Sequence, residues 1–150
     1  MGDGEWSEIR LYDQAHDAWN KANCARLPTT CAALRSIPSL SAAVVPTSST
    51  GGGVERVPGV VSVFRLRPGA SLVPHTGPTP ERTTLHLPLY VPVGASITVG
   101  GETRVWEAGK VLAFDDSFVH SVENTHPTEA RTVLLANVWK TAFLQPKPKG

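Results

Sequence analysis

The sequence predicts a mainly β domain, a sandwich or a barrel, with helical material near its N-terminus. From residue 60 onward, short segments rich in β-branched and aromatic residues alternate with turn residues. One stretch before them contains helix-forming residues and neither Gly nor Pro. The chain has 150 residues with 41% hydrophobic and 18% charged content, which suits one hydrophobic core. We therefore expect a single domain over residues 1–150.

The expected elements follow in chain order. Residues 13–25, "DQAHDAWNKANCA", predict one helix. Residues 37–59 are rich in Pro, Ser and Gly and predict a long flexible loop. "VGGET" at 99–103 predicts a hairpin turn, and residues 145–150 predict a disordered tail. Strands are expected at 60–67, 84–91, 95–100, 103–107, 111–115 and 132–139.

The overall charge and hydropathy exclude several classes of partner. A net charge of +1 gives no electrostatic indication of a nucleic acid or of an anionic membrane. No apolar run approaches the roughly 20 residues of a membrane helix, and the start has no apolar signal core. We expect no nucleic-acid partner and no membrane segment in this chain. Two cysteines, Cys24 and Cys31, are too few for a zinc ribbon and form either one short disulfide or two separate thiols.

Three residues at strand ends suggest a metal and a cosubstrate. His75 ends an early expected strand, His120 begins a late one, and Arg131 opens the last one. Each alone is ordinary in a β protein, but together they have the layout of an iron- and 2-oxoglutarate-dependent oxygenase with a double-stranded β-helix, or jelly-roll and cupin-like, fold. Imidazole suits Fe(II), and an arginine pairs with the distal carboxylate of the cosubstrate. The usual third ligand is an acid two residues after the first histidine, where this chain has Gly77.

His86 lies on the same face of its expected strand as Thr84, Pro88 and Tyr90. This placement admits two interpretations, a histidine packed inside the barrel or a histidine that contacts the cosubstrate.

Five further residues have structural interpretations. Asp115 and Asp116, in "FDDS", are typical of a turn after a strand. Arg82 is expected in a solvated loop. Trp106 and Trp139 are expected in the core.

Three long segments resemble one family. They are "PHTGPTPERTTLHLPLYVP" at 74–92, "WEAGKVLAFDDSFVHSV" at 106–122 and "RTVLLANVW" at 131–139. Together with "NCARLPTTCAAL" at 23–34, they resemble the catalytic domain of aspartyl/asparaginyl β-hydroxylase, a dioxygenase dependent on Fe(II) and 2-oxoglutarate. The resemblance runs from about Trp6 to Trp139, except for the Ser- and Gly-rich loop.

The resemblance implies a role for each candidate residue. The family keeps two histidine ligands with a glycine at the carboxylate position, which implies His75 and His120 as the metal ligands. Arg131 matches the arginine for the distal carboxylate of 2-oxoglutarate, and His86 matches a histidine that helps to hold the cosubstrate. Thr84 stands where the family has an arginine in the cosubstrate site, and Arg82 is a candidate substitute.

The resemblance also implies a disulfide between Cys24 and Cys31. The implied reaction hydroxylates the β-carbon of Asp or Asn residues in a peptide or protein substrate, with O2 as the oxidant. The compartment is the lumen of the endoplasmic reticulum if the parent protein follows the animal enzymes, and otherwise the cytoplasm.

Alternatives stay open at this point. They are a related oxygenase or halogenase acting on a free amino acid or small metabolite, a non-catalytic cupin-like metal-binding module, and a degenerate homologue that acts as a scaffold.

Overall fold

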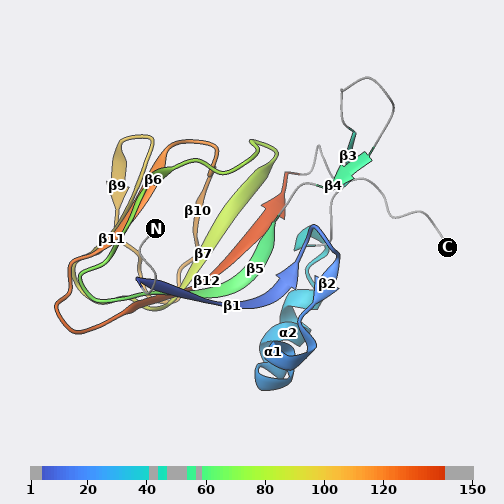
Figure 1. Cartoon of the computed structure of the whole chain (residues 1–150), viewed down its shortest axis with the longest axis horizontal. Helices are drawn as coiled ribbons and strands as arrows, with labels where there is room; N and C mark the ends of the chain where they lie inside the picture. The colour runs from blue at the N-terminus through green and yellow to red at the C-terminus, as the bar shows by residue number, and fades with distance from the viewer. Residues whose placement is uncertain (1–4, 41–43, 47–53, 57–58, 141–150) are drawn as a thin grey trace.

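Two antiparallel sheets pack face to face in the computed structural model, which describes residues 5–40, 44–46, 54–56 and 59–140. The larger sheet has the strand order β10-β7-β12-β5-β1-β2 and the smaller sheet has the order β6-β11-β8-β9 (Figure 1). The larger sheet consists of β1 (Trp6–Asp13), β2 (Ala18–Trp19), β5 (Val60–Leu66), β7 (Arg82–Tyr90), β10 (Leu112–Phe114) and β12 (Arg131–Trp139). The smaller sheet consists of β6 (Ser71–His75), β8 (Ala95–Val99), β9 (Glu102–Arg104) and β11 (His120–Asn124). The prediction of a mainly β fold of the double-stranded β-helix type is confirmed.

The strands expected from residue 60 onward all form. The hairpin predicted at 99–103 joins β8 to β9, and Gly100 and Gly101 have φ angles of 56° and 87°. Two consecutive positive φ angles are what a tight hairpin turn requires, and glycine adopts them without steric cost. Local β patterns and turn residues were therefore sufficient to locate these strands.

Two hydrophobic cores lie on opposite faces of the larger sheet. The core between the sheets joins the buried residues Leu66, Ala70, Ala95, Ile97, Trp106 and Val122. The second core lies between the helices and the other face of the larger sheet, and it joins Leu11, Tyr12, Cys24, Cys31, Leu34, Leu40, Val61 and Ala136. The helices thus cover one face of the sheet, and the other face is directed toward the interior between the sheets (Figure 1).

The single helix predicted over residues 13–25 is wrong. β1 continues to Asp13 because its residues pair with β5 from Trp6↔Leu66 to Asp13↔Val60, and this long-range ladder overrides local helix propensity. A turn and β2 follow, and the helical part consists of α1 (Lys21–Arg26) and α2 (Pro28–Arg35). Asn20 caps α1 by accepting a hydrogen bond from the Asn23 backbone N–H, and Pro28 occupies the first turn of α2.

The segment predicted as a long loop, 37–59, contains three short elements among its described residues. These are η1 (Pro38–Leu40), β3 (Val44–Pro46) and β4 (Val54–Arg56), and the two strands pair with each other. The rest of that segment, apart from Ile37 and Gly59, and the predicted tail at 145–150 lie outside the described residues.

Candidate active site

His75 and His120 lie next to each other in the smaller sheet. β6 ends at His75, β11 begins at His120, and the two residues are paired across the antiparallel ladder. Their ring centroids are 4.3 Å apart. The register shifts between His120 and Val122, and such a bulge reorients a side chain at a strand end. The fold therefore brings together two imidazoles that are far apart in the sequence.

Both imidazoles are held by the same local contact. His75 Nδ1 lies 2.8 Å from the Val73 carbonyl oxygen, and His120 Nδ1 lies 2.9 Å from the Phe118 carbonyl oxygen. A carbonyl can only accept, so each Nδ1 carries the proton and each Nε2 keeps a free lone pair. This backbone contact fixes ring orientation and tautomer in the way that metal-binding histidines require. The pair therefore suits one metal ion through two Nε2 atoms.

The electrostatic surroundings of His120 favour the neutral ring. Burial lowers the pKa of His120, and the neighbouring His75 lowers it further, while the bond to the Phe118 carbonyl raises it. The neutral imidazole is the form that binds a metal.

An acidic residue from another loop fills the space beside Gly77. A Cβ atom at position 77 would lie within 2.5 Å of the Asp116 carboxylate, and the Gly77 N–H donates to the Asp116 carbonyl at 2.6 Å. Asp116 is buried and accepts from Arg82 Nη2 at 2.7 Å. The expectation of a solvated Arg82 is wrong, because Arg82 begins β7 as a buried partner of Asp116.

The neighbouring Asp115 follows the turn interpretation. Its carboxylate accepts from the backbone N–H and the hydroxyl of Ser117, and it pairs with Lys140. Within the described ranges, no group of three or more His, Cys, Asp or Glu side chains is arranged to hold a metal ion. The two imidazoles are therefore candidate metal ligands without a third His, Cys, Asp or Glu side chain beside them in the described ranges.

Arg131 lies buried on the larger sheet, facing the interior. It is 3% exposed, and within the part of the chain that the structure describes no carboxylate pairs with it. Its Nη2 donates to His86 Nδ1 at 3.1 Å, and its Nε has no acceptor there. Burial lowers the pKa of Arg131 to about 9, so the guanidinium stays charged at neutral pH. A buried cation without an acid is costly unless a ligand brings the negative charge.

His86 is the neutral partner of this arginine. Burial lowers the pKa of His86 well below its usual value, and the charges of Arg131 and His120 lower it further. Because Nδ1 accepts from Arg131, the proton of the neutral ring is on Nε2.

Phe114 connects the two halves of the candidate site. Its ring centroid is 5.1 Å from that of His86 on the larger sheet and 5.3 Å from that of His120 on the smaller sheet. His120 and the Arg131–His86 pair therefore lie on either side of Phe114, and the exposed His75 lies beside His120.

Thr84 is occupied by a structural contact. It is buried, and its hydroxyl accepts from the Asn137 side-chain amide at 2.8 Å. Its role in cosubstrate binding stays a prediction.

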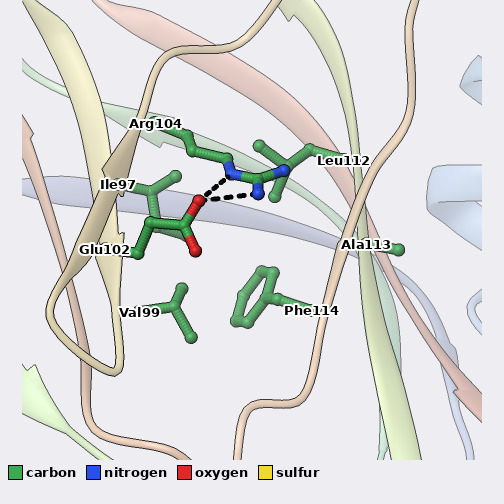
Figure 2. A pocket seen from close by; sticks show the side chains of 7 residues that line it. All are labelled: Ile97, Val99, Glu102, Arg104, Leu112, Ala113 and Phe114. Atoms are coloured by element: carbon green, nitrogen blue, oxygen red, sulfur yellow. Dashed lines mark hydrogen bonds and ion pairs between the residues drawn. The ribbon is translucent and has the colours of Figure 1, made fainter.

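A cavity of about 200 Å³ opens at the edge of the barrel between β9 and β10. Its walls combine apolar side chains with the ion pair between Glu102 and Arg104, which points into it (Figure 2). Val99 and Phe114, which both line the cavity, are neighbours of His120, Val99 by strand pairing and Phe114 by ring contact. A small ligand in this cavity would therefore lie close to the histidine pair.

Comparison with known proteins identifies the family. A profile of the Aspartyl/Asparaginyl beta-hydroxylase family matches residues 1–141. The chain belongs to this family. Aspartyl/asparaginyl beta-hydroxylase of Mus musculus is 36% identical over 137 residues, and that of Homo sapiens is 35% identical over 137 residues. The resemblance found in the sequence motifs is thus confirmed at the level of the family.

The chain corresponds to part of these relatives. The match with the mouse protein covers 91% of this chain and 16% of that protein. Human aspartate beta-hydroxylase domain-containing protein 2 is 32% identical, and the match covers 91% of this chain and 34% of that protein. A solved structure, a predicted oxalate decarboxylase from Thermotoga maritima, is 19% identical with a TM-score of 0.45, and the match covers 69% of this chain and 98% of that chain.

Two further features bear on the β-hydroxylase family expectations. The disulfide implied by the resemblance is present, and it joins Cys24 of α1 to Cys31 of α2. Among the described residues, no helix is long and apolar enough to span a membrane.

Two contacts at the site were not predicted. The Arg82–Asp116 pair joins residues from separate strands and loops, and no local pattern signals it. Trp106 belongs to the core as expected, but it also contacts Arg131.

Proposed function

We propose that the chain is the catalytic domain of an Fe(II)- and 2-oxoglutarate-dependent dioxygenase that hydroxylates the β-carbon of Asp or Asn residues in a peptide or protein. The observation that carries the proposal is Arg131, a buried cation whose described surroundings contain no acid partner. Its partner His86 and the buried His120 both contact Phe114, and the exposed His75 lies beside His120. One ligand with a metal-chelating end and a distal carboxylate would satisfy both halves, and 2-oxoglutarate has both groups.

The residues fit the proposed cofactors. His75 and His120 would hold Fe(II) through Nε2, and two protein ligands leave room for a chelating keto acid, O2 and water. Arg131 would receive the distal carboxylate in a charge-assisted hydrogen bond, while His86 keeps accepting from Nη2. Together, Fe(II), 2-oxoglutarate and O2 supply the oxidising power for C–H hydroxylation, with succinate and carbon dioxide as by-products.

The chain contributes positioning and exclusion of water. The Val73 and Phe118 carbonyls hold the histidine rings in one tautomer, and Phe114 closes the space between His86 and His120. The burial of Arg131 and His86 keeps the cosubstrate end of the site dry, which strengthens its electrostatic contacts.

The test is turnover of 2-oxoglutarate by the purified chain. Fe(II) and 2-oxoglutarate are titrated without oxygen, oxygen is then admitted, and succinate is measured. His120→Ala is expected to abolish succinate formation, whereas His16→Ala, at an exposed histidine on the turn after β1, is expected to leave it unchanged. Equal turnover by the wild type and His120→Ala would contradict the proposal.

The cavity between β9 and β10 favours a second candidate on the same scaffold, an oxygenase or halogenase that acts on a free amino acid or small metabolite. A space of about 200 Å³, into which the Glu102–Arg104 pair points, suits a small zwitterion better than a folded domain. The masses of products from peptides and from free aspartate, with and without chloride, distinguish these reactions. If the chain is a non-catalytic metal-binding module, it will bind the metal but form no succinate in the turnover assay.

A further inference from the structure

Trp106 contacts Arg131, which the proposed function assigns to the distal carboxylate, and His86, the hydrogen-bond partner of Arg131. The Arg131 Cζ atom lies 4.2 Å from the centre of the indole ring. The His86 ring is 5.9 Å from the indole ring and nearly parallel to it, at an interplanar angle of 25°. Trp106 itself is 6% exposed, so these contacts are desolvated. The indole ring therefore packs against both the arginine and its histidine partner.

A cation–π contact of this kind accounts for how Arg131 stays buried and charged. Among the described residues, the guanidinium donates to neutral His86 and lies over the indole face, and it has no carboxylate there. The negative face of the indole offers part of the electrostatic compensation that a carboxylate would provide, and this attraction is strongest where water is excluded. It does so without occupying the N–H groups of the guanidinium.

Those N–H groups are the ones a ligand needs. Arg131 Nε and Trp106 Nε1 are both buried, and neither has an acceptor in the described part of the chain. An acid at the position of Trp106 would pair with Arg131 and compete with an incoming carboxylate. An aromatic ring holds the guanidinium from its face and leaves its edge open.

We propose that Trp106 is a positioning residue for the cosubstrate carboxylate, acting through Arg131. Its ring face fixes the plane of the guanidinium and supports the His86 ring, so that the open edge of Arg131 is directed to the ligand before binding. The inference rests on the proposed function for the identity of the ligand. It adds a residue that neither ligates the metal nor pairs with an acid, yet sets the affinity for 2-oxoglutarate.

The test is calorimetric titration of 2-oxoglutarate into the chain loaded with Zn(II), which keeps the site redox-inactive. Trp106→Leu removes the ring face. It is expected to raise the dissociation constant for 2-oxoglutarate about 10-fold or more, because the loss of a desolvated cation–π contact corresponds to a change of that size. Trp106→Phe keeps a smaller ring face, so its dissociation constant is expected between those of the wild type and the leucine variant. In turnover assays, the KM for 2-oxoglutarate should rise while kcat stays within about twofold.

Trp139 provides a matched control. It is also a buried tryptophan whose indole N–H has no acceptor among the described residues, but none of its described contacts involves Arg131. Trp139→Leu is expected to lower stability and to leave the affinity for 2-oxoglutarate at the wild-type value.

The outcomes separate the inference from the proposed function. Wild-type binding together with unchanged affinity in Trp106→Leu would overturn the role of Trp106 and leave the proposed function standing. Equal weakening by the phenylalanine and leucine variants, or by Trp106→Leu and Trp139→Leu, would also overturn it, because the ring face would then not be the cause. Absence of 2-oxoglutarate binding by the zinc-loaded wild type would remove the proposed function and this inference with it.

Discussion

Gly77 lies where the packing leaves no room for a side chain. The space that a side chain at position 77 would enter contains the Asp116 carboxylate, which Arg82 holds in place. An acid introduced at this position would meet a second acid at close range and would separate Asp116 from Arg82. The glycine is therefore required by packing as well as matching the two-histidine ligand set that the resemblance implies.

We predict that Gly77→Ala destabilises the fold by about 3 kcal/mol, because the new methyl group must break the buried Arg82–Asp116 pair. Urea denaturation measures the change in the free energy of unfolding. In an Asp116→Ala background, which is itself destabilised because Arg82 loses this partner, the same substitution should add less than about 1 kcal/mol. Additive costs would mean that Gly77 and Asp116 act independently.

His86 is expected to make stability depend on pH. Its pKa in the folded chain is well below 6.5. Above pH 6.5 the ring is therefore neutral in both the folded and the unfolded chain, and it adds nothing to the pH dependence of the free energy of unfolding. As pH falls below 6.5, the unfolded chain takes up the proton and the folded chain does not, so stability falls by up to about 1.4 kcal/mol per pH unit. Urea denaturation at a series of pH values from 7.5 to 5 measures the free energy of unfolding. Its slope against pH should be smaller in His86→Gln than in the wild type. Parallel curves for the two proteins would contradict the assignment.

At the scale of elements, the strand ends that carry the candidate site were predicted, while the bounds of β6 and β11 were not. The sequence analysis placed His75, His120 and Arg131 at strand ends, where β6, β11 and β12 have them, but it gave bounds only for the last of these strands. β1 was missed because its pairing with β5 is a long-range contact that local propensity does not report. The Trp106–Arg131 and Arg82–Asp116 contacts were missed for the same reason.

The disulfide between α1 and α2 stabilises an element remote from the candidate site. It closes a short loop and lies in the core on the helix side of the larger sheet, opposite the face that carries His86 and Arg131. Reduction should lower the free energy of unfolding by about 2–3 kcal/mol, chiefly by freeing the unfolded chain. Denaturation with and without reductant measures this difference.

The control is the double variant Cys24→Ala/Cys31→Ala, which should not respond to reductant. The dissociation constant for 2-oxoglutarate should be the same in oxidised and reduced wild type. A large change in that constant would mean that the helices and the site are coupled through the larger sheet.

At the scale of the whole molecule, the candidate site is divided between the two sheets. His75 and His120 belong to the smaller sheet, and Arg131 and His86 belong to the larger one. A ligand that chelates a metal at one end and meets Arg131 at the other would link the sheets across the core between them. We therefore predict that Zn(II) and 2-oxoglutarate together raise the melting temperature by more than the sum of their separate effects.

The size of this effect follows from mass action, since a ligand at 100 times its dissociation constant stabilises the folded state by about 2.7 kcal/mol. 2-Oxoglutarate alone should have little effect, because only its distal carboxylate would find a partner. His120→Ala should remove the response to zinc, and Arg131→Met should keep it while removing the extra stabilisation by 2-oxoglutarate. Thermal unfolding of the three proteins under four ligand conditions tests this pattern. Purely additive shifts of the melting temperature in the wild type would mean that the metal and the cosubstrate do not share one site. The division of the candidate site between two sheets would then have no role in binding them.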